Sequence, residues 1–217
     1  MIKIEEVEVV GLRHAIRGMR NPMNSWDKSD SYSTHILNEH NLNEAHFEFF
    51  VGDEDLKLAK SLSVSGADHR KFMRMIVVYL DVTAPLYWWK EFDTYKVGTV
   101  ANSCSTMHKI HDKEFTLADF SHEHLNDDSL DMLQNHLIKG LNAYREEYLI
   151  CKDKQDWWQM IQLLPSRYNQ KRTVMLNYEV LANIYKSRHN HKLDEWCTLC
   201  EWIEELPYSE LITGEER

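Results

Sequence analysis

The stretch that decides the fold runs from Leu164 to Trp202 and reads LPSRYNQKRTVMLNYEVLANIYKSRHNHKLDEWCTLCEW. Leu-Pro opens it, and proline does not continue a preceding helix. A short polar turn is expected at 166–171. One long helical run is then expected through 177–191 and onward to 195–196.

One face of this predicted helix is unusually polar. At 100° per residue, the side chains of Asn177, Leu181, Ile184, Arg188 and His191 fall within a stripe about 80° wide. Burying an amide or imidazole without a partner costs about 1–3 kcal/mol, and burying a guanidinium costs more. The stripe therefore predicts a polar ligand or a polar protein partner.

The same residues resemble the C-terminal region of the flavin-dependent (ThyX-type) thymidylate synthases. That region runs Leu-Pro, Asn, an aliphatic residue, a second Asn, Arg and His. Here the order is carried by Leu164, Pro165, Asn177, Leu181, Asn183, Arg188 and His191. The resemblance implies that Asn177, Asn183 and His191 contact the flavin. It also implies that Arg188 contacts the nucleotide substrate and acts in catalysis.

A second segment resembles the family's signature, which is Arg-His-Arg, two residues, Ser, one residue, Asn, two residues, Ser, one residue, Arg. This chain has the leading Pro85, and Asn102 and Ser105 keep the Asn-x-x-Ser spacing. The triplet falls on 94–96 or 95–97, where Lys96 is the only cation. The resemblance implies that Asn102 and Lys96 lie at the cofactor. It places Ser105 beside the nucleotide as a hydrogen-bonding, catalytic group.

Several family arginines are missing from this chain. The closing arginine of the signature is Met107, and its first serine is Val100 or Thr99. Near the C-terminus, Ile161 and Glu179 stand where the family has arginine. An exchange of arginine for glutamate reverses the local charge. The sequence therefore indicates a divergent member, for which the fold is the firmer expectation.

The resemblance implies an α+β fold, in which one domain spanning 1–217 packs an antiparallel-type sheet against several long helices. It implies reductive methylation of dUMP to dTMP with FAD, using NADPH and methylene-tetrahydrofolate as co-substrates. It also implies a homotetramer that binds a pyrimidine deoxynucleotide. Because of the missing arginines, a catalytically altered or inactive protein that still binds flavin or nucleotide is the alternative.

Composition narrows the class of protein. The 217 residues are 43% apolar, which favours a globular domain over disorder. The net charge of −10 disfavours nucleic-acid binding, because a phosphate backbone would be repelled. No apolar run is long enough for a membrane span, and the first residues lack a signal-peptide core. Four scattered cysteines predict a reducing, cytoplasmic setting.

Apolar periodicity and turn residues predict the remaining elements. Strands are expected at 1–12 and 46–51. A β-prone aromatic run is expected at 83–105. Helices are expected at 53–62, at 68–80, from 127 onward, at 157–164 and at 193–206, and Ser33 or Thr34 is expected to cap a short helix ending at Leu37.

A basic segment near the N-terminus offers an anion site. Arg13, His14, Arg17 and Arg20 precede a polar loop at 21–30. Arginine favours bidentate phosphate contacts. A solvated helix and loop is the alternative interpretation.

Three groups of metal-capable residues suggest other functions. His189 and His191 with Cys197 and Cys200 could bind zinc, although the cysteine spacing also suits a buried helix face.

The segment 108–124 contains His108, His111, Asp112, His122 and His124. Histidine and aspartate of this kind suggest a metal-dependent nucleotide phosphohydrolase of the HD type, or simply a histidine-rich loop. The string at 189–191 resembles that of HNH nucleases, but their hairpin and second metal-binding half are missing. We expect no metal.

Overall fold

The computed structural model describes residues 1–38 and 41–214, and only the backbone at 35–38 and 41–47. Two compact units are present. Unit 1 comprises Met1–Glu6, Leu80–Lys96 and Ala101–Val174. Unit 2 comprises Val7–Tyr79, Val97–Val100 and Met175–Arg217.

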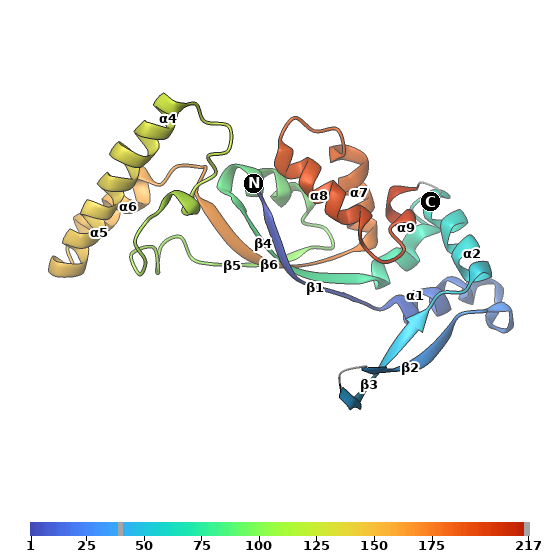
Figure 1. Ribbon diagram of the computed structural model, residues 1–217. Coiled ribbons are helices and arrows are strands. Elements are labelled where there is room, and N and C mark those ends of the chain that lie inside the picture. Colours follow the sequence, from blue (N-terminus) through green and yellow to red (C-terminus); the bar gives the residue numbers. More distant parts are fainter. Residues whose placement is uncertain (39–40, 215–217) are drawn as a thin grey trace. The chain divides into compact units, whose positions relative to one another are not determined.

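The strands are β1 (Lys3–Val10), β2 (Tyr32–Asn38), β3 (Asn41–Phe50), β4 (Val77–Pro85), β5 (Val100–Ser103) and β6 (Asn169–Asn177). In the described part of the chain, four of them form a sheet in the order β1-β4-β6-β5 (Figure 1). The other two, β2 and β3, form an antiparallel ribbon in which Tyr32 lies opposite Phe50. The rings of these two residues stack with centroids 5.4 Å apart.

The helices are α1 (Leu12–Met19), α2 (Asp53–Val64), α3 (Leu86–Phe92), α4 (Asp127–Asp131), α5 (Lys139–Cys151), α6 (Lys154–Leu163), α7 (Tyr178–Arg188), α8 (Asp194–Glu204) and α9 (Glu210–Thr213). A π-helical segment, η6 (Met132–Ile138), joins α4 to α5. The 3-10 helices are η1 (Asn21–Met23), η2 (Trp26–Lys28), η3 (Arg70–Met75), η4 (Asp93–Tyr95) and η5 (Leu117–Asp119).

This mixture of sheet and helices confirms the predicted α+β class. The predicted elements at 1–12, 46–51, 53–62, 157–164 and 193–206 are present within a few residues. The long helix from Asp127 is also present, as α4, η6 and α5. Among the described residues, no helix is both long and apolar enough to cross a bilayer.

The helix predicted at 68–80 is wrong. The chain forms the short helix η3 and then enters β4. In β4 the buried side chains alternate, with Val78, Leu80, Val82 and Ala84 each at most 2% exposed. This period of two belongs to a strand, and it outweighs the continuous apolar composition that suggested a helix.

Three further predictions are corrected. The short helix capped by Ser33 or Thr34 is part of β2, because this segment pairs with β3. The polar turn predicted at 166–171 is limited to its first half, because β6 begins at Asn169. The aromatic run at 83–105 contains α3, so only its ends are strands.

The single long helical run predicted from 177 is also wrong. It is two helices, α7 and α8, because the chain leaves the helix after Arg188 and re-enters it at Asp194. His191 therefore lies between the helices and not on a helical stripe.

The core of unit 1 is formed between the helices α5 and α6 and the segment that precedes them. α5 packs against α6. The buried cluster comprises Ile110, Phe115, Phe120, Leu133, Ile138, Leu141 and Met160. Asn142 fastens the incoming segment, because its amide exchanges two hydrogen bonds with the backbone of Phe115, at 2.8 and 2.9 Å.

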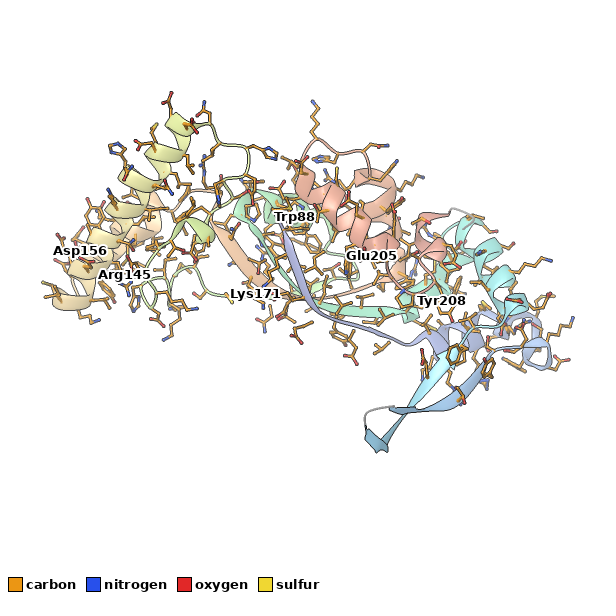
Figure 2. The ribbon with its side chains drawn as sticks, in the orientation of Figure 1. Trp88, Arg145, Asp156, Lys171, Glu205 and Tyr208 are labelled. Carbon is orange, nitrogen blue, oxygen red and sulfur yellow. The ribbon has the colours of Figure 1, made fainter. Side chains whose placement is uncertain are left out.

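In unit 2, α7 packs against α8, α9 and η3. Tyr178, at the first position of α7, is fully buried, and its hydroxyl donates to the carbonyl of Pro207 at 2.6 Å. The neighbouring Tyr208, labelled in Figure 2, accepts the backbone N–H of Val51 through its hydroxyl at 3.0 Å. Two tyrosine hydroxyls thus fasten the segment that leads into α9.

Candidate functional site

Asn177 ends β6 and caps α7. Its backbone is extended, and its side-chain oxygen accepts the N–H of Val180 at 3.1 Å, which is a standard N-cap contact. The amide nitrogen lies against Gly98, where an added Cβ would come within 3.0 Å of it. Asn177 is therefore held by the helix and by the 97–100 segment.

Glu179 and Asn183, on the next turns of α7, face two arginines of η3. Arg74 Nε donates to Glu179 at 2.5 Å, and Arg70 Nε donates to the same carboxylate at 3.3 Å. Arg70 Nη2 also donates to the side-chain oxygen of Asn183 at 3.0 Å. The hydrogen bond from Arg74 is the main reason why the pKa of Glu179 falls below its usual value.

Arg188 and His191 lie at the C-terminal end of α7. Arg188 Nη1 donates to His191 Nε2 at 2.9 Å, since a guanidinium has donors only. The guanidinium carbon lies 4.7 Å from the ring centroid of Trp196, which is fully buried. These contacts bring two predicted site residues together. Hydrogen-bonding and cation-π partners within the protein therefore already engage their side chains.

The residues on α7 fit a flavin at one position in particular. Asn183 is exposed, and its side-chain nitrogen has no partner in the described part of the chain. An amide nitrogen donates two hydrogen bonds, which suits the carbonyl-rich edge of an isoalloxazine ring. Asn177, Arg188 and His191 make contacts within the protein. The flavin contacts of Asn177 and His191 and the nucleotide contact of Arg188 therefore remain predictions.

Lys96, Asn102 and Ser105 belong to unit 1 and are all exposed. Asn102 lies on β5. Ser105 accepts the backbone N–H groups of Met107 at 3.2 Å and His108 at 2.9 Å through its hydroxyl oxygen. The hydroxyl hydrogen is left to donate to a ligand.

Two cations of β6, Arg172 and Lys171, could replace missing arginines, but both are engaged by carboxylates. Arg172 donates to Asp93 at 3.0 Å and lies 4.2 Å over the ring of Trp89. Lys171, labelled in Figure 2, pairs with Asp81 at 3.0 Å, and this hydrogen bond is the main reason why the pKa of Lys171 is raised. Lys96 is thus the exposed cation of the matched signature.

Sequence reasoning missed Arg70 and Arg74, because both lay inside the stretch assigned to an apolar helix. A signal was present. Four basic residues occupy 69–74, namely His69, Arg70, Lys71 and Arg74, and this density does not suit a buried helix.

The metal sites suggested by the sequence are not supported by the described side chains. Among residues 1–34 and 48–214, whose side chains the structure describes, no group of three or more His, Cys, Asp and Glu side chains could hold an ion. Cys200 is buried, which raises the pKa of its thiol to about 12, and Cys197 donates to the carbonyl of His191 at 3.4 Å. This is the buried-helix-face interpretation of the cysteine pair.

No protein-family model matches the sequence, and a search of curated proteins also finds no match. Solved structures do match. The thymidylate synthase ThyX of Helicobacter pylori with FAD and dUMP superposes with a TM-score of 0.68 and 14% identity, covering 99% of this chain and 98% of that one. The UMP/dUMP methylase PolB of Streptomyces cacaoi bound with 5-Br dUMP gives 0.60 and 14%, covering 99% and 95%. The likeness shows a ThyX-like fold.

Proposed function

We propose that this chain binds FAD and a pyrimidine nucleotide and reductively methylates the uracil ring, converting dUMP to dTMP. The observation that carries the proposal is that two enzymes with the same fold, from different organisms, both take a uracil nucleotide. The likeness extends over 99% of this chain in each comparison, so it does not come from a shared fragment.

The overall reaction balances with the co-substrates that the resemblance implies. Methylene-tetrahydrofolate would supply the carbon. This carbon would form a bond to C5 of the uracil ring, its two bonds to folate nitrogens would break, and the C5 hydrogen would leave as a proton. Bound reduced flavin would supply the hydride that completes the methyl group, and NADPH would restore the reduced flavin. The products are dTMP, tetrahydrofolate and oxidised NADP.

Residues of this chain would bind and orient the nucleotide. In this proposal the Ser105 hydroxyl donates to a uracil carbonyl, and Lys96 contacts the flavin cofactor. Asn102 and Asn183 donate to ligand carbonyls through their amides. A donor placed where negative charge develops on the ring stabilises the transition state. Asn177, Arg188 and His191 are assigned to positioning α7.

An absorption spectrum tests cofactor binding. Purified protein incubated with FAD and freed of excess cofactor is expected to show flavin bands between about 350 and 500 nm. Protein that remains colourless, with a melting temperature unchanged by FAD, would contradict flavin binding. Rescue of a thymidine-requiring bacterial strain then tests turnover, and light scattering tests the proposed homotetramer.

A second candidate is a relative that binds nucleotide but does not turn it over. One observation favours it. Where the family carries an arginine, Glu179 accepts hydrogen bonds from Arg70 and Arg74. Its negative charge is therefore paired with two arginines of the same chain. Protein that binds FAD and dUMP, yet forms no dTMP with all co-substrates present, would establish this candidate.

A further inference from the structure

A cavity of about 1140 Å³ lies in unit 2, lined by residues of α1, η1, η2, α2 and η3 and of the turns between them. Small-molecule pockets are usually about 300–1,000 Å³, so this one has room for a nucleotide or a dinucleotide. None of the residues that the resemblance assigned to the flavin or the substrate lines it. Its apolar lining comprises Met19, Leu58, Leu62, Phe72 and Met75.

A buried ion pair shapes one wall of the cavity. Asp55 is fully buried and Arg20 is 5% exposed, and Arg20 Nε donates to the Asp55 carboxylate at 2.5 Å. The hydroxyls of Ser29 and Ser31 also donate to Asp55, at 2.5 and 2.6 Å. Burial alone would raise the pKa of Asp55, but these hydrogen bonds lower it.

The loop that carries the cavity residues is therefore fixed at both ends. Asp30 adds to this by accepting the backbone N–H groups of Glu54 and Asp55, at 2.9 and 3.0 Å. A wall that is already ordered costs a ligand little conformational entropy on binding.

Positive charge gathers at the rim of the cavity. Arg17, Lys28 and Lys71 line it, are exposed, and have no carboxylate partner in the described part of the chain. One carboxylate, Asp68, shares the lining, so the cations outnumber it. The chain as a whole has a net charge of −10, whereas the cations that line this cavity outnumber the carboxylates.

We propose that this cavity is a nucleotide site, in which Arg17 and Lys71 hold the phosphate and the aromatic base packs on the apolar lining around Phe72. The Arg17 guanidinium also lies 5.8 Å from the ring of Trp26, in a cation-π contact. A planar guanidinium can bind phosphate through two hydrogen bonds. The proposal rests on the proposed function for the class of ligand, and it adds a second nucleotide site, formed by residues other than Ser105, Lys96 and Asn102.

Isothermal titration calorimetry on the full chain tests the site. The probes are dUMP, FAD, deoxyuridine and inorganic phosphate. The double variant Arg17→Gln/Lys71→Gln is compared with the control Lys113→Gln/Lys139→Gln, which removes two exposed cations of unit 1. All four side chains are exposed, so both variants are expected to fold, which the melting temperature checks.

At this second site the cavity variant is expected to bind dUMP, FAD or both at least about tenfold more weakly than the wild type, because two charge-assisted contacts are lost. Binding that depends on Ser105 is expected to be unchanged. The control is expected to bind as the wild type does. A comparison of dUMP with FAD shows whether a mononucleotide or a dinucleotide is the ligand.

Two outcomes would overturn the site. One is nucleotide binding that is unchanged in the cavity variant, which leaves the proposed function standing. The other is deoxyuridine binding as tightly as dUMP, which would mean that the rim cations hold nothing. If the wild type binds neither dUMP nor FAD, the proposed function fails. Inorganic phosphate binding that is lost only in the cavity variant would still support a phosphate site.

Discussion

Arg74 and Glu179 stand 105 positions apart in the chain, and Arg74 Nε donates to Glu179 Oε2 across 2.5 Å. Arg70 donates to the same carboxylate and also to Asn183. This network ties η3 to α7, the helix that carries the residues resembling a flavin site. A position where the family has a positive charge therefore holds a negative one, and its hydrogen bonds connect η3 to α7.

The exchange Glu179→Gln should lower the free energy of unfolding by about 1–2 kcal/mol, because Arg70 and Arg74 lose their shared carboxylate and Arg74 is half exposed. Urea denaturation measures this. The folded-state pKa of Glu179 lies below its usual 4.5. The stabilisation is therefore complete above that value and is lost as the pH falls through the folded-state pKa. A difference between variant and wild type that grows on acidification would contradict this.

The exchange Asp55→Asn should cost about 3–5 kcal/mol, because it leaves the Arg20 guanidinium buried without its carboxylate. Asp53→Asn is the matched control. It makes the same change in the same first turn of α2, but at an exposed side chain, and should cost about 0.5 kcal/mol. Chemical denaturation measures both changes in the free energy of unfolding. Equal changes in the two variants would show that the buried ion pair stabilises the protein no more than the exposed carboxylate does.

The exchange Gly98→Ala should destabilise the protein more than Gly66→Ala does. Both glycines have positive φ, +83° and +101°, so each alanine costs about 1–2 kcal/mol of backbone strain. An added Cβ at Gly98 also meets Asn177 at 3.0 Å and Val180 at 3.1 Å, whereas at Gly66 nothing lies within 4 Å. Melting temperatures of the two variants measure the difference. If they were equal, the close approach of Gly98 to the cap of α7 would be without energetic consequence.

The exchange Ser105→Ala should weaken dUMP binding about tenfold if its hydroxyl donates to the nucleotide, as the proposed function requires. Ser103→Ala is the control, because Ser103 is exposed on the neighbouring β5. Ser105 also accepts the N–H groups of Met107 and His108, so Ser105→Thr is needed as a variant that keeps the oxygen. Titration calorimetry with dUMP compares the three. Weak binding by the threonine variant alone would point to crowding and not to a lost hydrogen bond.

Much of the secondary structure could be predicted where one local pattern governed a segment. One example is α2, with its acidic first turn and apolar face, and another is the leucine spacing of α4, η6 and α5. Both patterns lie within a few turns of helix. β4 could also have been found. Its alternation of buried residues from Val78 to Ala84 was present in the sequence but was hidden by a mostly apolar composition.

The sequence offered candidate site residues, but it could not predict the contacts that these residues make. The order of residues from Leu164 to His191 identified α7 and the family of folds, which the likeness to ThyX bears out. It did not show that Arg70 would donate to Asn183, or that Arg188 would donate to His191 and stack on Trp196. Hydrogen bonds of this kind depend on which elements pack together, and a helical stripe read alone has no information about its neighbours.

The sequence by itself determined the position of most helices and the acidic character of the chain, because these follow from local periodicity and from composition. Its resemblance to a known family indicated the α+β class. Only the tertiary structure decided which charged side chains form ion pairs within the protein and which stay exposed. Arg20 and Arg74 are paired with carboxylates far away in the chain, whereas Arg17 and Lys71 are left at the rim of a cavity. Identical side chains acquire different roles because ion pairing acts through space and not along the sequence.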